Sequence, residues 1–130
     1  MRNAIYWVEI PATNFERAKK FYETIFDIEM ILVPIPRGKY AIFPLDKDAL
    51  GGGGAIVEGK GYKPSENSGN GPVVYLDRGR DDLSIPLSKV EQAGGKILMP
   101  KTKNSDNPET GFIAQFIDSE GNKMGVHSNK

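Results

Sequence analysis

The opening of the chain changes from a strand pattern to a helix pattern. Apart from Glu9, residues 4–10 are apolar, β-branched or aromatic, as in a strand, and Pro11 ends this run. Thr13 and Glu16 have the spacing of a capping box, which predicts a helix start, and Asp27 is expected to end the helix. The apolar positions between them form one helical stripe: Phe15, Ala18, Phe21, Tyr22, Ile25 and Phe26.

The same order of elements is predicted twice. After the first helix, strands are expected over residues 28–34, 39–43 and 55–58. In the second half, a strand over 72–77 precedes a helix over 83–93, a strand over 96–100 and a hairpin formed by 111–118 and 123–128. Each half therefore reads β-α-β-β-β, and residues 8–34 align with 74–100 without a gap.

Residues 59–71 are polar and rich in glycine, and they are predicted to connect two modules, about 1–58 and 72–130. A module of this size cannot bury both faces of a four-stranded sheet alone. We therefore expect one α+β domain over residues 1–130, built from two βαβββ modules.

Composition excludes several classes of function. The chain has 17 Lys plus Arg and 17 Asp plus Glu, so its net charge of +0 gives no electrostatic basis for binding nucleic acid or an anionic membrane. No apolar run reaches the roughly 18 residues that span a bilayer, and no secretory leader is evident, so a cytoplasmic protein is expected. The absence of Cys and the single His exclude thiolate metal sites and any mechanism needing two imidazoles in one chain.

Two segments carry a family resemblance. Residues 8–22, Val-Glu-Ile-Pro-Ala-Thr-Asn-Phe-Glu-Arg-Ala-Lys-Lys-Phe-Tyr, resemble the opening of the vicinal oxygen chelate superfamily, which contains glyoxalase I, the bleomycin-resistance proteins and the extradiol dioxygenases. Residues 118–128, Asp-Ser-Glu-Gly-Asn-Lys-Met-Gly-Val-His-Ser, resemble its closing hairpin. The resemblance implies a mixed sheet curled around a small-molecule pocket, and often a homodimer.

Metal-dependent members of that superfamily carry ligands at four strand positions. The resemblance places these positions at Trp7, at Gly54 or Ala55, at Gly71 or Pro72, and at Gly125. None of these side chains is a metal ligand, so no cofactor is expected and a divalent metal is disfavoured. The remaining metal hypothesis is an unconventional site made by Glu9, Glu58 and His127.

Strand alternation then predicts which side chains face the pocket. The predicted lining is apolar with a few polar groups, as is usual for a small-molecule site, and Tyr6, Val8 and Ile10 are expected to pack under the helix. Each lining residue also has a structural interpretation, as a core aromatic, an exposed acid, an ion-pair partner of Lys123 or part of a sheet face. The predicted lining residues are Trp7, Glu9, Tyr75, Gln115 and His127.

Two functions remain open. The first is a metal-free protein that binds a small molecule. The second is a lyase or isomerase related to glyoxalase I, in which Glu9 is the general base and His127 or Tyr75 donates a hydrogen bond to the reacting oxygen. The four glycines at 51–54 could form an anion nest, but no helix follows them, which favours a close approach of backbones at a strand instead.

Overall fold

The computed structural model describes residues 4–49 and 51–130. In the first half, the elements are β1 (Trp7–Pro11), α1 (Phe15–Phe26), β2 (Ile31–Ile35), β3 (Gly38–Ile42) and β4 (Gly53–Gly59). In the second half they are β5 (Val74–Asp77), α2 (Ser84–Lys89), β6 (Lys96–Lys103), a short 3-10 helix (Pro108–Thr110), β7 (Phe112–Ile117) and β8 (Lys123–Ser128). The predicted βαβββ order therefore occurs twice.

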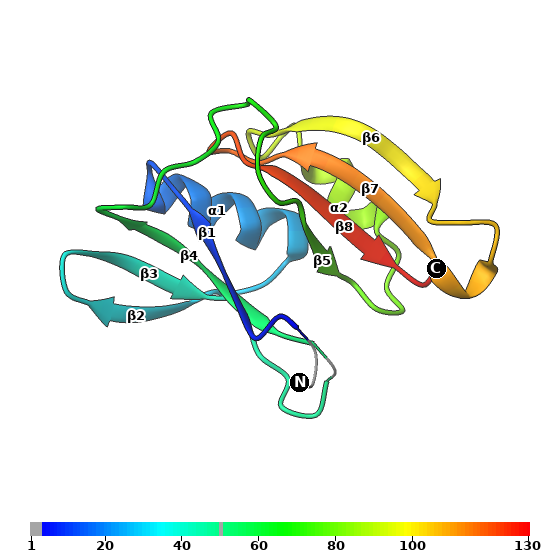
Figure 1. Ribbon diagram of the computed structural model, residues 1–130, viewed down its shortest axis with the longest axis horizontal. Coiled ribbons are helices and arrows are strands. Elements are labelled where there is room, and N and C mark those ends of the chain that lie inside the picture. Colours follow the sequence, from blue (N-terminus) through cyan, green and yellow to red (C-terminus); the bar gives the residue numbers. More distant parts are fainter. Residues whose placement is uncertain (1–3, 50) are drawn as a thin grey trace.

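Each half forms its own four-stranded mixed sheet. The first sheet has the strand order β1-β4-β3-β2 and the second has the order β5-β8-β7-β6. In both, the first strand of the half runs parallel to the last one, and the remaining pairs are antiparallel. Figure 1 shows the first sheet on the left, the second on the right and the two helices near the middle. This confirms the α+β class and the paired modules.

The helix α1 buries the predicted stripe completely, because all six of its apolar positions are buried. Its predicted start is wrong, however. The N-cap is Asn14, whose side chain accepts a hydrogen bond from the Arg17 amide at 3.0 Å, whereas Glu16 pairs with Lys39 instead of closing a capping box. Asn is as good an N-cap as Thr, so the two candidates could not be separated by residue type alone.

Several predicted boundaries also differ. The strand predicted over 4–10 begins at Trp7, and Tyr6, expected under the helix, is 89% exposed because it precedes the strand. The helix predicted over 83–93 is α2, which ends at Lys89 and is followed by turns up to Gly94, a residue with φ of 104°. The strand predicted over 96–100 is β6, which extends to Lys103.

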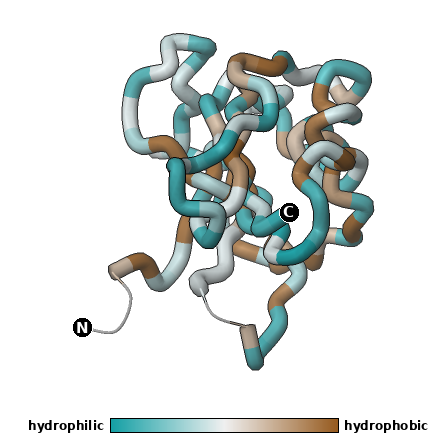
Figure 2. Tube along the Cα trace, turned by 90° about the vertical axis from the view of Figure 1, so that its right-hand side faces the viewer, coloured by the Kyte–Doolittle hydropathy of each residue, from teal (hydrophilic) through white to brown (hydrophobic). Residues whose placement is uncertain are grey.

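One buried apolar cluster contains residues of both modules. It includes Phe21 and Tyr22 of α1, Leu83 and Val90 beside α2, and Phe116 of β7. The helices contact each other, and α1 packs on β3 and β4. Figure 2 shows that much of the outer loops is hydrophilic. Neither helix among the described residues is long and apolar enough to cross a membrane.

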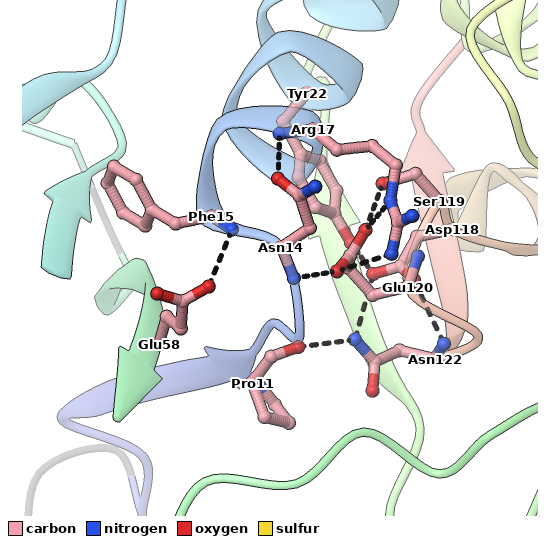
Figure 3. A network of polar contacts seen from close by, with 10 residues as sticks. All are labelled: Pro11, Asn14, Phe15, Arg17, Tyr22, Glu58, Asp118, Ser119, Glu120 and Asn122. Carbon is pink, nitrogen blue, oxygen red and sulfur yellow. Dashed lines mark hydrogen bonds and ion pairs between the residues drawn. The ribbon is translucent and has the colours of Figure 1, made fainter. Parts of the chain in front are cut away.

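A polar network joins the closing hairpin to the start of α1 (Figure 3). The buried carboxylate of Asp118 accepts hydrogen bonds from the Tyr22 hydroxyl at 2.6 Å and from the side-chain and backbone nitrogens of Asn122. Burial raises the pKa of Asp118. The carboxylate of Glu120 accepts a hydrogen bond from the backbone amide of Asn14 at 2.7 Å and forms a bidentate ion pair with Arg17. These bonds join the two modules within one chain.

The connector between the modules is also bound to this hairpin. The amide of Asn67 donates to the carbonyl of Gly121 at 2.9 Å, and the hydroxyl of Ser65 donates to the same carbonyl at 3.0 Å. The side-chain amide of Asn122, in the same hairpin, donates a hydrogen bond to the carbonyl of Pro11 at 2.8 Å. The glycine-rich segment is therefore held against the second module, although its composition is that of a flexible linker.

Candidate functional site

The face of each sheet that points away from the helices carries the candidate site. In β1, Val8 and Ile10 pack with the core below α1. Because side chains alternate along a strand, Trp7 and Glu9 lie on the opposite face, as predicted. We call this side of the first sheet, and the corresponding side of the second sheet, the helix-free faces.

On the first helix-free face, Trp7 reaches across β4 to β3. Its indole nitrogen donates a hydrogen bond to the Tyr40 hydroxyl at 2.8 Å. This reach requires small residues on β4, because a Cβ at Gly53 would lie 2.7 Å from the Trp7 ring. A Cβ at Gly52 would lie 2.8 Å from the backbone oxygen of Tyr6, and a Cβ at Gly54 would lie 2.8 Å from that of Val8. The glycines at 52–54 therefore allow β1 to approach β4 closely, which is the interpretation that the sequence analysis favoured over an anion nest.

Glu9 lies on the same face, two residues after Trp7. It is exposed, and its carboxylate accepts a hydrogen bond from the Tyr62 hydroxyl at 2.8 Å. Hydrogen bonding to Glu9 raises the pKa of Tyr62. The pKa of Tyr40 is raised first by burial and then by the same carboxylate. Glu9 is therefore next to two tyrosine hydroxyls, one from β3 and one from the connector.

The second helix-free face repeats this construction. The Tyr75 hydroxyl of β5 accepts a hydrogen bond from the Gln115 side chain of β7 at 2.6 Å. The two side chains meet over β8, where a Cβ at Gly125 would lie 2.3 Å from the Tyr75 ring. In each module a first-strand aromatic residue thus bonds a third-strand side chain and packs against a glycine of the last strand, Trp7 against Gly53 and Tyr75 against Gly125.

His127 joins three segments at the far end of β8. Its Nδ1 lies 2.9 Å from the Asp77 carboxylate of β5, and its Nε2 lies 3.0 Å from the Thr110 carbonyl. Both neighbours are hydrogen-bond acceptors, so a protonated ring satisfies both and a neutral ring satisfies one. The hydrogen bond with Asp77 accordingly raises the pKa of His127.

The five predicted site residues therefore fall into two groups, one on each module. Trp7 and Glu9 belong to the first, and Tyr75, Gln115 and His127 to the second. Two cavities of about 310 and 390 Å³ lie elsewhere, the first around the closing hairpin and the second between α1 and the β2–β3 edge.

Sequence reasoning missed three residues of these groups, namely Tyr40, Tyr62 and Asp77. One available signal was the repeated order of an aromatic residue, an apolar residue and an acid, which occurs at 7–9 and again at 75–77. Strand alternation then places Asp77 beside Tyr75. For Tyr62, which lies in the connector, the sequence offers no comparable signal.

The geometry does not assemble the hypothetical metal site of Glu9, Glu58 and His127. Glu9 pairs in register with Ala55, and Glu58 lies an odd number of residues further along β4, so it points to the opposite face. There its carboxylate accepts from the Phe15 amide at the start of α1, at 3.1 Å. Across residues 4–49 and 51–130, no three His, Asp or Glu side chains gather where they could hold a metal ion.

The superfamily's own ligand positions do not fit a divalent metal either. At the position of the final ligand, Gly125 offers no donor, and the ring of Tyr75 lies against its backbone. At the position of the first ligand, the Trp7 nitrogen is a donor only and is already bonded to Tyr40. The residues present therefore do not supply the oxygen or imidazole ligands that such an ion requires.

Comparison with known proteins identifies the family. A glyoxylase-like domain-containing protein from Didymella fabae is 30% identical over 129 residues, which cover 97% of this chain and 94% of that protein. The chain belongs to the glyoxalase-like proteins of the vicinal oxygen chelate superfamily. CFP32 of Mycobacterium bovis, which bears a provisional glyoxylase name, is 28% identical over 122 residues, 92% of this chain. The match spans only 43% of CFP32. No family model matches the chain.

Solved structures show the same fold. A glyoxalase I mutant from Zea mays superposes with a TM-score of 0.69 at 23% identity, over 95% of this chain and 46% of the maize chain. TnmS3, an antibiotic binding protein from Streptomyces sp. CB03234, superposes with a TM-score of 0.60 at 20% identity, over 97% of this chain and 95% of its own. At these identities the likeness establishes the fold alone.

Proposed function

We propose that this protein binds a small molecule on the helix-free faces of its sheets and that it does so without the divalent metal of its metal-dependent relatives. The observation that carries the metal-free part of the proposal is the Tyr75 ring, which packs against Gly125 at the position where metal-dependent members carry their final ligand. The fold is shared with an antibiotic binding protein, which supports a binding role. Aromatic surface with a few polar groups is the usual composition of such sites.

The first test is the metal content of untagged protein prepared without chelators, measured by elemental mass spectrometry. Less than about a tenth of an equivalent of any divalent ion per chain is expected. About one equivalent would overturn the metal-free proposal.

The second test locates binding. A library of small fragments of mixed charge is screened by ligand-observed NMR, and the amide shifts of the protein are then followed with each binder. Shifts concentrated on β1, β3, β4 or on β5, β7, β8 are expected. Binders that shift only other segments, or a screen without binders, would refute the proposed binding face.

The alternative proposal is a lyase or isomerase related to glyoxalase I. It is favoured by one observation, the exposed Glu9 carboxylate beside the Tyr62 and Tyr40 hydroxyls, because a base next to proton donors is the arrangement that general acid–base catalysis needs. The hemithioacetal of methylglyoxal and glutathione is the substrate to test. Turnover that Glu9→Gln abolishes without loss of substrate binding would establish this activity; turnover unchanged by that substitution would exclude the role of Glu9.

We also propose that the protein is a homodimer. Support comes from β2, an outer strand of the first sheet, where Ile31 is 53% exposed and Leu32 is 64% exposed. Large apolar side chains on an unpaired sheet edge favour association. Sedimentation equilibrium should give twice the chain mass, and a Leu32→Lys variant should shift the mass toward that of the monomer. A single-chain mass for the unmodified protein would contradict the proposal.

A further inference from the structure

Three side chains of the first module and one of the connector form what we call the Glu9 cluster: Trp7, Glu9, Tyr40 and Tyr62. Trp7 and Glu9 come from alternate positions of β1, Tyr40 comes from β3, and Tyr62 follows β4 in the connector. Trp7 is bonded to Tyr40 at 2.8 Å, and Tyr62 is bonded to Glu9 at 2.8 Å. One carboxylate therefore lies beside the hydroxyls of Tyr40 and Tyr62 and on the same sheet face as Trp7.

The charge of this carboxylate has no cationic partner among the described residues. The hydrogen bond that Glu9 receives comes from a neutral hydroxyl, and the ion pairs of residues 4–49 and 51–130 all involve other acids. Its negative charge acts on both neighbouring tyrosines, whose pKa values it raises. The corresponding acid of the second module, Asp77, lies instead against His127.

The aromatic rings around Glu9 are likewise not covered by the protein's own cations. The two cation–π contacts in the described part of the chain are Arg78 over Phe26 and Lys101 over Phe112. The cluster is open to solvent, because Glu9 is exposed and Tyr62 is 39% exposed. Aromatic rings beside an anionic group attract organic cations, and quaternary ammonium groups suit them best because their methyl groups lose little hydration on binding.

We propose that the Glu9 cluster is the subsite for a positively charged, alkylated ammonium group of the protein's small-molecule ligand. The inference rests on the proposed binding function and names the chemical class of ligand that the first module selects. In this arrangement, Glu9 supplies the opposite charge, the rings of Trp7 and Tyr40 supply the apolar and cation–π surface, and Tyr62 holds the carboxylate in place.

The test uses choline as the probe and 3,3-dimethylbutan-1-ol as its uncharged counterpart of the same shape. Trp7 is the only tryptophan of the chain, so its fluorescence reports this cluster alone. We expect choline to change Trp7 fluorescence saturably, with sodium chloride replacing choline chloride at constant ionic strength. The alcohol should bind at least about tenfold more weakly, since it lacks both the ionic and the cation–π attraction.

Two matched variants locate the effect. Glu9→Gln keeps the shape of the side chain and removes its charge, so it should weaken choline binding at least about tenfold. Glu91→Gln makes the same change at an exposed acid that follows α2, away from both helix-free faces, and should leave choline binding unaltered. Both variants are compared by circular dichroism to confirm that they fold.

The outcomes separate this inference from the proposed function. If fragments bind the helix-free faces in the NMR screen but choline binds no better than the alcohol, the ammonium subsite is wrong and the binding function stands. Equal weakening by Glu9→Gln and Glu91→Gln would also overturn the subsite, because the effect would then reflect the net charge of the protein. Absence of any binder in the screen would refute the binding function itself.

Discussion

The first strands of the two modules present the same short pattern with different partners. Trp7 and Glu9 on β1 correspond in spacing to Tyr75 and Asp77 on β5. Each aromatic residue bonds a third-strand side chain and packs against a glycine of the last strand. The acids differ, because Glu9 accepts from a tyrosine hydroxyl whereas Asp77 accepts from the only histidine of the chain.

This difference shows which part of the construction the sheet imposes and which part is free to change. The aromatic ring against glycine recurs because a large ring can lie across a strand only where that strand has no side chain in the way. The partner of the acid comes from a different segment in each module: the connector supplies Tyr62 and β8 supplies His127. The same arrangement of strands therefore leaves Glu9 without a cationic partner among the described residues and places Asp77 beside an imidazole.

The largest effect on stability is expected from breaking the polar network that joins the two modules. Asp118→Ala removes the acceptor of the Tyr22 hydroxyl, which is fully buried, together with the bonds to Asn122. Leaving these buried donors unsatisfied should lower the free energy of unfolding by about 3 kcal/mol or more. Urea denaturation followed by circular dichroism measures it, and a loss below about 1 kcal/mol would show that the hairpin does not hold the modules together.

The second largest effect on stability is expected from a substitution of Gly125, the glycine beneath Tyr75. Gly125→Ala should lower the free energy of unfolding by about 1–2 kcal/mol, because the added methyl group must displace the Tyr75 ring. Ala normally stabilises a strand relative to Gly, so the sign of the change is informative. In a Tyr75→Ala background the same substitution should become neutral or stabilising. An unchanged cost in that background would mean that the ring is not the obstacle.

The two bridges can be compared by removing one hydroxyl from each. Tyr40→Phe leaves the partly buried Trp7 nitrogen without its acceptor and should cost about 1 kcal/mol. Tyr75→Phe breaks a solvent-exposed bond to Gln115 and should cost about 0.5 kcal/mol or less. Thermal and urea unfolding of the two variants provide the measurement. A larger loss for Tyr75→Phe would reverse the ranking of the bridges.

A smaller effect follows from the histidine of the second module. Because the folded protein raises the pKa of His127, the pair with Asp77 contributes its full stability below the ordinary histidine value of 6.5 and loses it as pH rises through the higher folded value. The loss should be about 0.5 kcal/mol for this partly exposed pair. Unfolding free energies measured from pH 5.5 to 9 should show this decline, and Asp77→Asn should flatten it.

The smallest effect concerns the tyrosines beside Glu9. Glu9→Gln should lower the pKa of Tyr62 toward its ordinary value, because hydrogen bonding to that carboxylate is the main cause of the shift. Tyr40 should respond less, since burial is the larger cause of its raised pKa. Absorbance titration near 295 nm follows both groups, and Asp77→Asn is the control that should leave them unchanged.

Sequence by itself determined the local architecture of this protein. The apolar stripe of α1 could be predicted because helix periodicity depends on neighbouring residues, and all six predicted positions are buried. The doubled βαβββ order followed from the same local patterns. Alternation along β1 placed Trp7 and Glu9 on one face correctly, since the side-chain period of a strand is fixed by its backbone.

Tertiary structure alone decided which side chains meet. The Trp7–Tyr40 and Tyr75–Gln115 bridges depend on strand order, which puts β4 and β8 between their partners. The Tyr62 hydroxyl reaches Glu9 because the connector folds back over the sheet, and nothing in a polar, glycine-rich segment specifies that path. Contacts between residues far apart in sequence are set by the packing of whole elements, and so the division of the site residues between the two modules became visible only in the folded chain.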